Sequence, residues 1–127
     1  MTEVSFINLY EGQPSYGEID LELRGHGFVP HTFAAINRRM LRPLQVPDPH
    51  AAMNQVLEAD VVYVRDFRRP ELMSDGQLKN LALLAHHVWR SYDLTASCMQ
   101  ALLDRKTIPS SSLDRYCGFV AKQLGRR

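Results

Sequence analysis

A polar and aromatic turn follows the first apolar run of the sequence, and Tyr10, Glu11 and Gln13 lie in it. Ligands of α/β folds bind at the edge formed by the carboxyl ends of the strands. If the apolar run is a strand of such a sheet, we expect these three side chains to line a substrate pocket. The alternative is a simple turn that Gly12 and Pro14 shape and in which Glu11 is solvated. Neither interpretation assigns a catalytic residue.

The histidines do not have the spacing of metal ligands. Neighbouring residues on a helix point about 100° apart, so His86 and His87 cannot ligate one ion together. His26, His31 and His50 lie in different predicted elements. We therefore predict no metal site.

Other polar groups have simple structural interpretations. Arg38, Arg39 and Arg42 are able to hold a phosphate or a carboxylate, but a solvated loop is the favoured interpretation. Ser110 to Ser112 have no neighbouring base and suit a linker and helix cap. Glu3 is either a functional carboxylate or one that is paired or exposed at a sheet edge.

Cysteine spacing and composition limit the class of protein. Cys98 and Cys117 are too far apart for a CxxC motif, and we expect buried, reduced thiols, with a disulfide as the alternative. The 127 residues suffice for one modest core, and a net charge of +1 gives no basis for nucleic-acid or charged-membrane partners. Without a leader-like start or a long apolar run, we expect a cytoplasmic protein.

The first half of the chain predicts an α/β unit. Residues 3–9 are apolar on both faces, which is typical of a strand covered on both sides. A helix over 15–25 should bury Tyr16, Ile19 and Leu23 and end at a left-handed Gly27 cap. Pro30 favours an edge position for a strand over 28–36.

Between that strand and the next we expect a long loop over residues 37–58. It should contain a short helix over 51–57 that is entered through Asp48 and Pro49. The four successive apolar residues Val61 to Val64 indicate a central strand over 59–67 that is buried on both faces.

Helical periodicity dominates from Pro70 onward. Ser74 and Gln77 form a capping-box pattern, and the following stripe predicts a helix that continues to Tyr92. Two more helices are expected over 93–105 and 113–124, separated by Pro109 and the serines. The expected domains are an α/β part over residues 1–69 and a helical tail over 70–127.

Five short segments together resemble FkbM-family methyltransferases, which use S-adenosylmethionine. They are EVSF (3–6), LYEGQP (9–14), GF (27–28), DVVYVR (60–65) and, in the tail, SYDL (91–94). The resemblance implies the C-terminal half of a Rossmann-like sheet with strand order 3-2-1-4-5-7-6. The strands predicted here would then be strands 5, 6 and 7, with strand 7 antiparallel between the other two.

The cofactor-binding half that the resemblance implies has no counterpart in the sequence. The family binds S-adenosylmethionine with a glycine-rich turn after strand 1 and an acidic residue after strand 2. The seven glycines form no such turn. We therefore expect an open edge along residues 3–9, which pairs with a second copy of the chain or with a chain that carries the missing half.

The resemblance implies transfer of a methyl group to a hydroxyl oxygen of a sugar or another small metabolite in the complete enzyme. This chain would be inactive alone, as the product of a truncated gene, a split gene or an incomplete gene model. Two alternatives remain open from the sequence: a non-enzymatic interaction module, and a subunit that completes a methyltransferase in trans.

Overall fold

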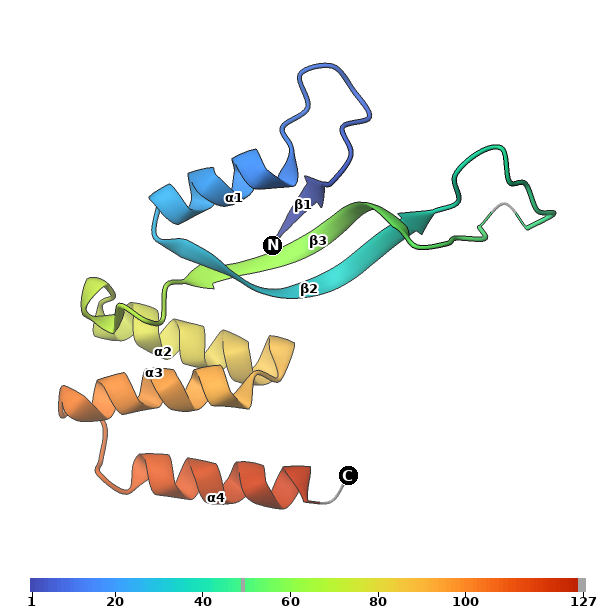
Figure 1. Ribbon diagram of the computed structural model, residues 1–127. Coiled ribbons are helices and arrows are strands. Elements are labelled where there is room, and N and C mark those ends of the chain that lie inside the picture. Colours follow the sequence, from blue (N-terminus) through green and yellow to red (C-terminus); the bar gives the residue numbers. More distant parts are fainter. Residues whose placement is uncertain (49, 126–127) are drawn as a thin grey trace. The chain divides into compact units, whose positions relative to one another are not determined.

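The computed structural model describes residues 1–48 and 50–125. It divides into two compact units, Met1–Val64 and Arg65–Arg127, and each is considered by itself. The first unit contains β1 (Thr2–Ser5), α1 (Tyr16–Gly25), β2 (Phe28–Arg39) and β3 (Gln55–Arg65). The protein therefore belongs to the α/β class, with a small sheet followed by helices (Figure 1).

The sheet of the first unit has the order β1-β3-β2. β3 is antiparallel to β1, with Val4 opposite Ala59 and Thr2 opposite Val61, and its arrow also opposes that of β2 in Figure 1. The predictions of a central third strand and an edge strand containing Pro30 are confirmed. Within the described residues the only parallel pairing of β1 is a single bridge between Ser5 and Ser15, so the parallel part of a Rossmann-like sheet is not seen.

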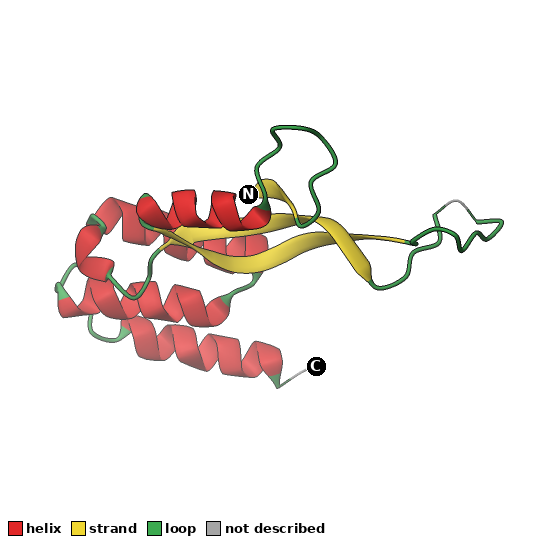
Figure 2. Cartoon of the chain, turned by 45° about the horizontal axis from the view of Figure 1, so that its top comes forward, coloured by secondary structure: helices red, strands yellow, loops and turns green. Residues whose placement is uncertain are grey.

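The helix α1 lies across one face of this sheet (Figure 2). Tyr16 and Ile19 pack on a buried cluster formed by Val4, Ala59 and Val61. The helix begins with a reciprocal capping box between Ser15 and Glu18. It ends at Gly25 with His26 as its C-cap, and the following Gly27 has a φ of 80°, the left-handed value that glycine adopts without strain. The predicted helix and its glycine cap are confirmed, but Tyr16, Ile19 and Leu23 are half-buried rather than buried as expected.

The first strand is shorter than predicted. β1 ends at Ser5, and residues 6–14 form a loop in which Phe6, Ile7 and Leu9 are exposed. The side-chain amide of Gln13 accepts the Leu9 amide hydrogen, which turns the backbone away from the sheet. The expectation of a strand over 3–9 with both faces covered was therefore wrong beyond Ser5.

The predicted helix over 51–57 is absent, because the chain already belongs to β3 from Gln55 onward. The Phe6 amide donates a 2.7 Å hydrogen bond to the Leu57 carbonyl, and Ser5 pairs with Glu58. Pairing with a neighbouring strand thus overrides the helical preference of this segment. The predicted entry through Pro49 lies outside the described residues.

The second unit is helical. It comprises the short 3₁₀ turn η1 (Pro70–Leu72), α2 (Asp75–Leu84), the π-helical turn η2 (Ala85–Trp89), α3 (Tyr92–Asp104) and α4 (Ser112–Leu124). α3 contacts both α2 and α4 and lies between them in Figure 1. The predicted capping box at Ser74 is present, and the last two helices lie within one residue of the predicted bounds.

The first helix of this unit ends earlier than its apolar stripe suggests. After η2, Arg90 adopts a left-handed conformation with φ 54°, and the Ser91 amide donates to the Ala85 carbonyl at 2.8 Å. Tyr92 consequently starts α3. Cys98 is buried, as expected, but Cys117 is exposed, which corrects its predicted burial; both are free thiols.

Candidate functional site

The loop over residues 6–14, at the carboxyl end of β1, holds the three residues predicted to line a substrate pocket. Gln13 organises it. Its side-chain Nε2 donates to Oγ of Ser5 at 2.6 Å, and its Oε1 accepts the Leu9 amide hydrogen at 2.8 Å. Its carbonyl accepts from Nδ2 of Asn8 at 2.9 Å. Gln13 is thus a half-buried clamp that fixes the loop to the end of the strand.

The tip of the loop is a tight turn. The Gln13 amide donates to the Tyr10 carbonyl at 3.2 Å, and Gly12 has a φ of 74°. Tyr10 is 72% exposed and Glu11 is also exposed. The structure therefore brings the three predicted residues together but divides their roles. Gln13 holds the backbone, whereas Tyr10 and Glu11 present their side chains to solvent.

The outer edge of β1 adjoins this loop. Because the Phe6 amide bonds to β3 and hydrogen-bonded positions alternate along an antiparallel pair, the amide of Glu3 points away from β3. Among the described residues, no strand pairs with Glu3 on that side, and Ser5 is covered there by its bridge to Ser15. The edge combines an unpaired strand segment with exposed apolar neighbours, Phe6, Ile7 and Leu9.

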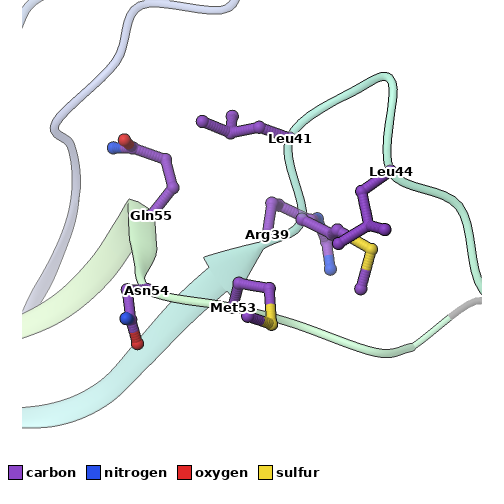
Figure 3. A pocket seen from close by; sticks show the side chains of 7 residues that line it. Arg39, Leu41, Leu44, Met53, Asn54 and Gln55 are labelled. Carbon is purple, nitrogen blue, oxygen red and sulfur yellow. The ribbon is translucent and has the colours of Figure 1, made fainter.

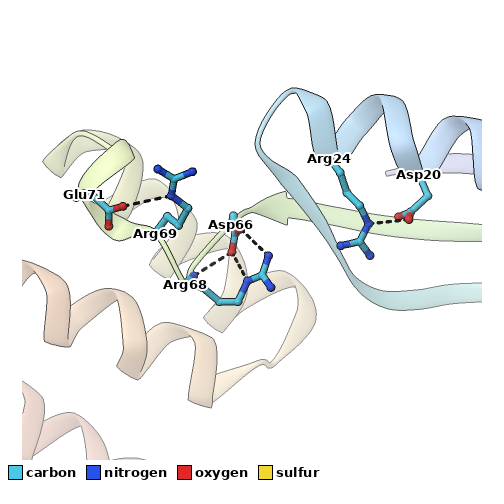
Figure 4. A network of polar contacts seen from close by, with 6 residues as sticks. All are labelled: Asp20, Arg24, Asp66, Arg68, Arg69 and Glu71. Atoms are coloured by element: carbon cyan, nitrogen blue, oxygen red, sulfur yellow. Dashed lines mark hydrogen bonds and ion pairs between the residues drawn. The ribbon is translucent and has the colours of Figure 1, made fainter.

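A polar link holds α1 to the sheet. The Tyr63 hydroxyl donates to Oδ1 of Asp20 at 3.0 Å, and Oδ2 of Asp20 pairs with Nε of Arg24 at 2.7 Å (Figure 4). Burial and the neighbouring Asp20 carboxylate raise the pKa of Tyr63 well above its ordinary value. The neutral phenol is the form that donates the hydrogen bond to Asp20.

The other ion pairs in Figure 4 belong to the start of the helical unit. Asp66 accepts from both Nε and Nη2 of Arg68, and Arg69 lies 3.4 Å from Glu71. The hydrogen bonds from Arg68 lower the pKa of Asp66. These are local, largely exposed pairs between near neighbours in sequence, and such pairs contribute little to stability.

A first cavity of about 410 Å³ lies at the far end of the β2–β3 hairpin (Figure 3). Arg39 is its one charged side chain, and Met40, Leu41, Leu44 and Met53 supply most of its apolar wall. Arg38 and Arg39 belong to β2 rather than to a loop, which corrects the sequence interpretation, and Arg38 and Arg42 do not line the cavity. The three arginines therefore do not converge on one anion site here.

A second cavity of about 580 Å³ runs along the helices of the second unit. It is largely apolar, and the charged or titratable groups in its lining include Lys79, His86 and His87. Nδ1 of His86 lies 2.9 Å from the hydroxyl of Tyr116, which links η2 to α4. From the apolar stripe between Leu78 and Tyr92 we predicted a helix but no cavity.

Within the described residues, the remaining reactive groups are the thiols, the candidate metal ligands and the serines before α4. Burial raises the pKa of Cys98 to about 11, so this thiol is protonated at neutral pH. In the described part of the chain, no group of three or more histidine, cysteine or acidic side chains has the geometry of a metal site. Ser111 occupies the N-cap position of α4 but makes no side-chain cap bond. Across residues 1–48 and 50–125, no helix has the length and apolar character needed to span a membrane.

Comparison with known proteins found no matching protein-family model, no matching curated protein and no matching solved structure.

Proposed function

We propose that this chain is the acceptor-side, C-terminal half of an FkbM-like, S-adenosylmethionine-dependent methyltransferase. Joined to a cofactor-binding half, it would transfer a methyl group to a hydroxyl oxygen of a sugar or small metabolite. Alone, it would be inactive. The complementary half would come from a further segment or from a separate chain.

The observation that carries this proposal is the order and direction of the strands. The resemblance implies a last strand that lies antiparallel between its two predecessors. The sheet has the order β1-β3-β2, and β3 is antiparallel to β1. β1, α1, β2 and β3 follow one another as strands 5 to 7 of such an enzyme would. This agreement involves residues far apart in sequence, such as Thr2 and Val61, which pair across β1 and β3.

The open edge of β1 supports the same proposal. In the implied order, strand 5 has a parallel neighbour, strand 4, on the side opposite strand 7. This is the side to which the Glu3 amide points, next to exposed Phe6, Ile7 and Leu9. A strand added there would pair the free backbone groups and cover apolar surface, and both effects favour association.

The loop after β1 supplies the acceptor side of the proposed site. Because Gln13 fixes the loop, Tyr10 and Glu11 stand at the edge where the strand ends. There a phenol and a carboxylate would bind the hydroxyl groups of an acceptor molecule, with the carboxylate accepting hydrogen bonds. We assign them to acceptor binding and assign no catalytic residue.

A binding experiment tests the proposal. A fragment with strands 1 to 4 of an FkbM-family methyltransferase is mixed with this chain, and the mass of the complex is measured by light scattering during chromatography. We expect a one-to-one complex, which Glu3→Pro abolishes by removing the outward amide hydrogen, while Glu3→Ala retains it. If the fragment never binds, or if both variants bind equally, the proposed edge is wrong.

The alternative function is a non-enzymatic interaction module, and exposed apolar residues on the helical unit favour it. They include Leu83, Val88 and Phe119. A module that binds its partner through the helical tail would be indifferent to Glu3→Pro, whereas one that binds through the open edge of β1 would not. The pair of variants therefore separates binding at the edge from binding at the helices, and S-adenosylmethionine binding by the complex separates the enzyme from a module that uses the edge.

A further inference from the structure

The second cavity is a groove built from three helical stripes. α3 forms its floor with Thr95, Met99 and Leu102, which are spaced four and three residues apart. Residues at such spacings share one helix face. The same periodicity places Lys79, Leu83 and His86 in one wall of the groove. The other wall contains Ser112, Tyr116 and Phe119. The remaining lining residues are Ala82, His87, Ile108 and Pro109.

The two ends of the groove differ in character. Nη1 of Arg105 bonds to Oδ1 of Asp75 at 2.8 Å, which places the start of α2 beside the end of α3. Lys79, one turn after Asp75, therefore lies at the end of the groove where α4 begins with Ser112. His86 and Tyr116, joined by their 2.9 Å hydrogen bond, form the other end.

The charge of the groove is one-sided. Among the described residues, its lining contains one lysine and two histidines and no carboxylate. Lys79 is exposed, and its ammonium group makes no hydrogen bond or ion pair that the structure records within residues 1–48 and 50–125. An apolar groove with the Lys79 ammonium group at one end complements an elongated ligand that has an apolar body and an anionic head.

The size of the groove limits the ligand. His86 is the seventh residue after Lys79, so the apolar wall between them is about 10 Å long at the rise of an α-helix. The volume of about 580 Å³ falls within the range of small-molecule sites. A body of this length corresponds to a medium-chain alkyl group rather than to a long membrane lipid.

We propose that this groove binds a medium-chain carboxylate, with the alkyl chain along Met99 and Leu102 and the carboxylate beside Lys79 and the Ser112 hydroxyl. The site lies entirely within the helical unit. It is independent of the proposed methyltransferase function, so each can fail without the other.

The test uses decanoate as the probe and the intact chain labelled at its methionine methyl groups. In methyl carbon–proton spectra, the Met99 signal should shift saturably with decanoate, whereas Met73, which is buried in the same unit and lies outside the groove lining, serves as the internal reference. Decylamine, which has the same alkyl chain and the opposite charge, should bind more weakly. An unchanged Met99 signal, or equal affinity for the two probes, would overturn the proposal.

Charge-reversal variants sharpen the test. K79E should weaken decanoate binding roughly fivefold to tenfold, as expected for losing and reversing an exposed ion pair, and should leave the helical content unchanged. K122E is the matched control, because Lys122 is an exposed lysine of α4 outside the groove lining. If K122E weakens decanoate binding as much as K79E does, the loss of affinity results from the changed net charge of the protein. The position assigned to the carboxylate beside Lys79 is then wrong.

Discussion

The hydroxyl of Tyr63 on β3 donates a 3.0 Å hydrogen bond to the carboxylate of Asp20 on α1. None of the residues of α1 is fully buried. Its attachment to the sheet therefore depends on the half-buried Tyr16 and Ile19 and on this polar link across 43 residues of sequence.

Tyr63→Phe should destabilise the first unit by about 1 kcal/mol, the usual net value of one hydrogen bond. The ring remains and packs as before, while Asp20 keeps its ion pair with Arg24. Urea unfolding followed by circular dichroism measures the change. Leu21→Ala, at an exposed position of the same helix, is a control that should change stability by less than half as much.

The raised pKa of Tyr63 also predicts a dependence of stability on pH. The folded state favours the neutral phenol, so its stabilising contribution is complete below the ordinary tyrosine pKa near 10 and is lost as the pH rises above it. The wild type should therefore lose more stability than Tyr63→Phe does when the pH rises from about 9 to about 11, which is roughly one unit either side of the ordinary tyrosine pKa. Parallel curves for the two proteins would show that the phenol is not linked to folding.

Gln13→Ala should release the loop after β1. It removes the side-chain bonds to Ser5 and Leu9, and we expect a loss of about 1–2 kcal/mol in unfolding free energy. Hydrogen exchange at the Leu9 amide should become faster. Glu11→Ala, in the same loop and with an exposed side chain, should leave both quantities nearly unchanged. Unaltered exchange at Leu9 in Gln13→Ala would contradict the role of Gln13 as a clamp.

The serines before α2 and α4 offer a matched pair. The Ser74 side chain accepts the Gln77 amide hydrogen at 3.2 Å, whereas Ser111, at the same position before α4, makes no cap bond. Ser74→Ala should cost about 1 kcal/mol, and Ser111→Ala only a few tenths. Thermal unfolding measures both. Equal losses would mean that the cap geometry does not determine the stability of these helices.

Local sequence signals predicted the elements that depend on local chemistry. The Ser74–Gln77 capping box, the Gly27 cap and the proline of the edge strand all correspond to structure. These features depend on a few neighbouring residues and on backbone geometry, which the sequence displays directly.

Features that depend on distant contacts were missed. The segment after Met53 pairs as a strand because Phe6 and Ser5 lie beside it, and β1 ends early because Gln13 reaches back to Leu9. The candidate loop at Tyr10 to Gln13 was located from sequence, but the clamp role of Gln13 was not. The helical groove was missed because an apolar stripe that lines a cavity has the same periodicity as one that is packed.

In the proposed function, S-adenosylmethionine binding requires a second half beside β1. Calorimetric titration with S-adenosylmethionine addresses it directly, first with this chain alone and then with its complex with strands 1 to 4 of an FkbM-family methyltransferase. We expect no heat of binding from the chain alone and saturable one-to-one binding in the micromolar range, about −8 kcal/mol, from the complex. Saturable binding to the chain alone, or none to a complex shown to have formed, would contradict the account.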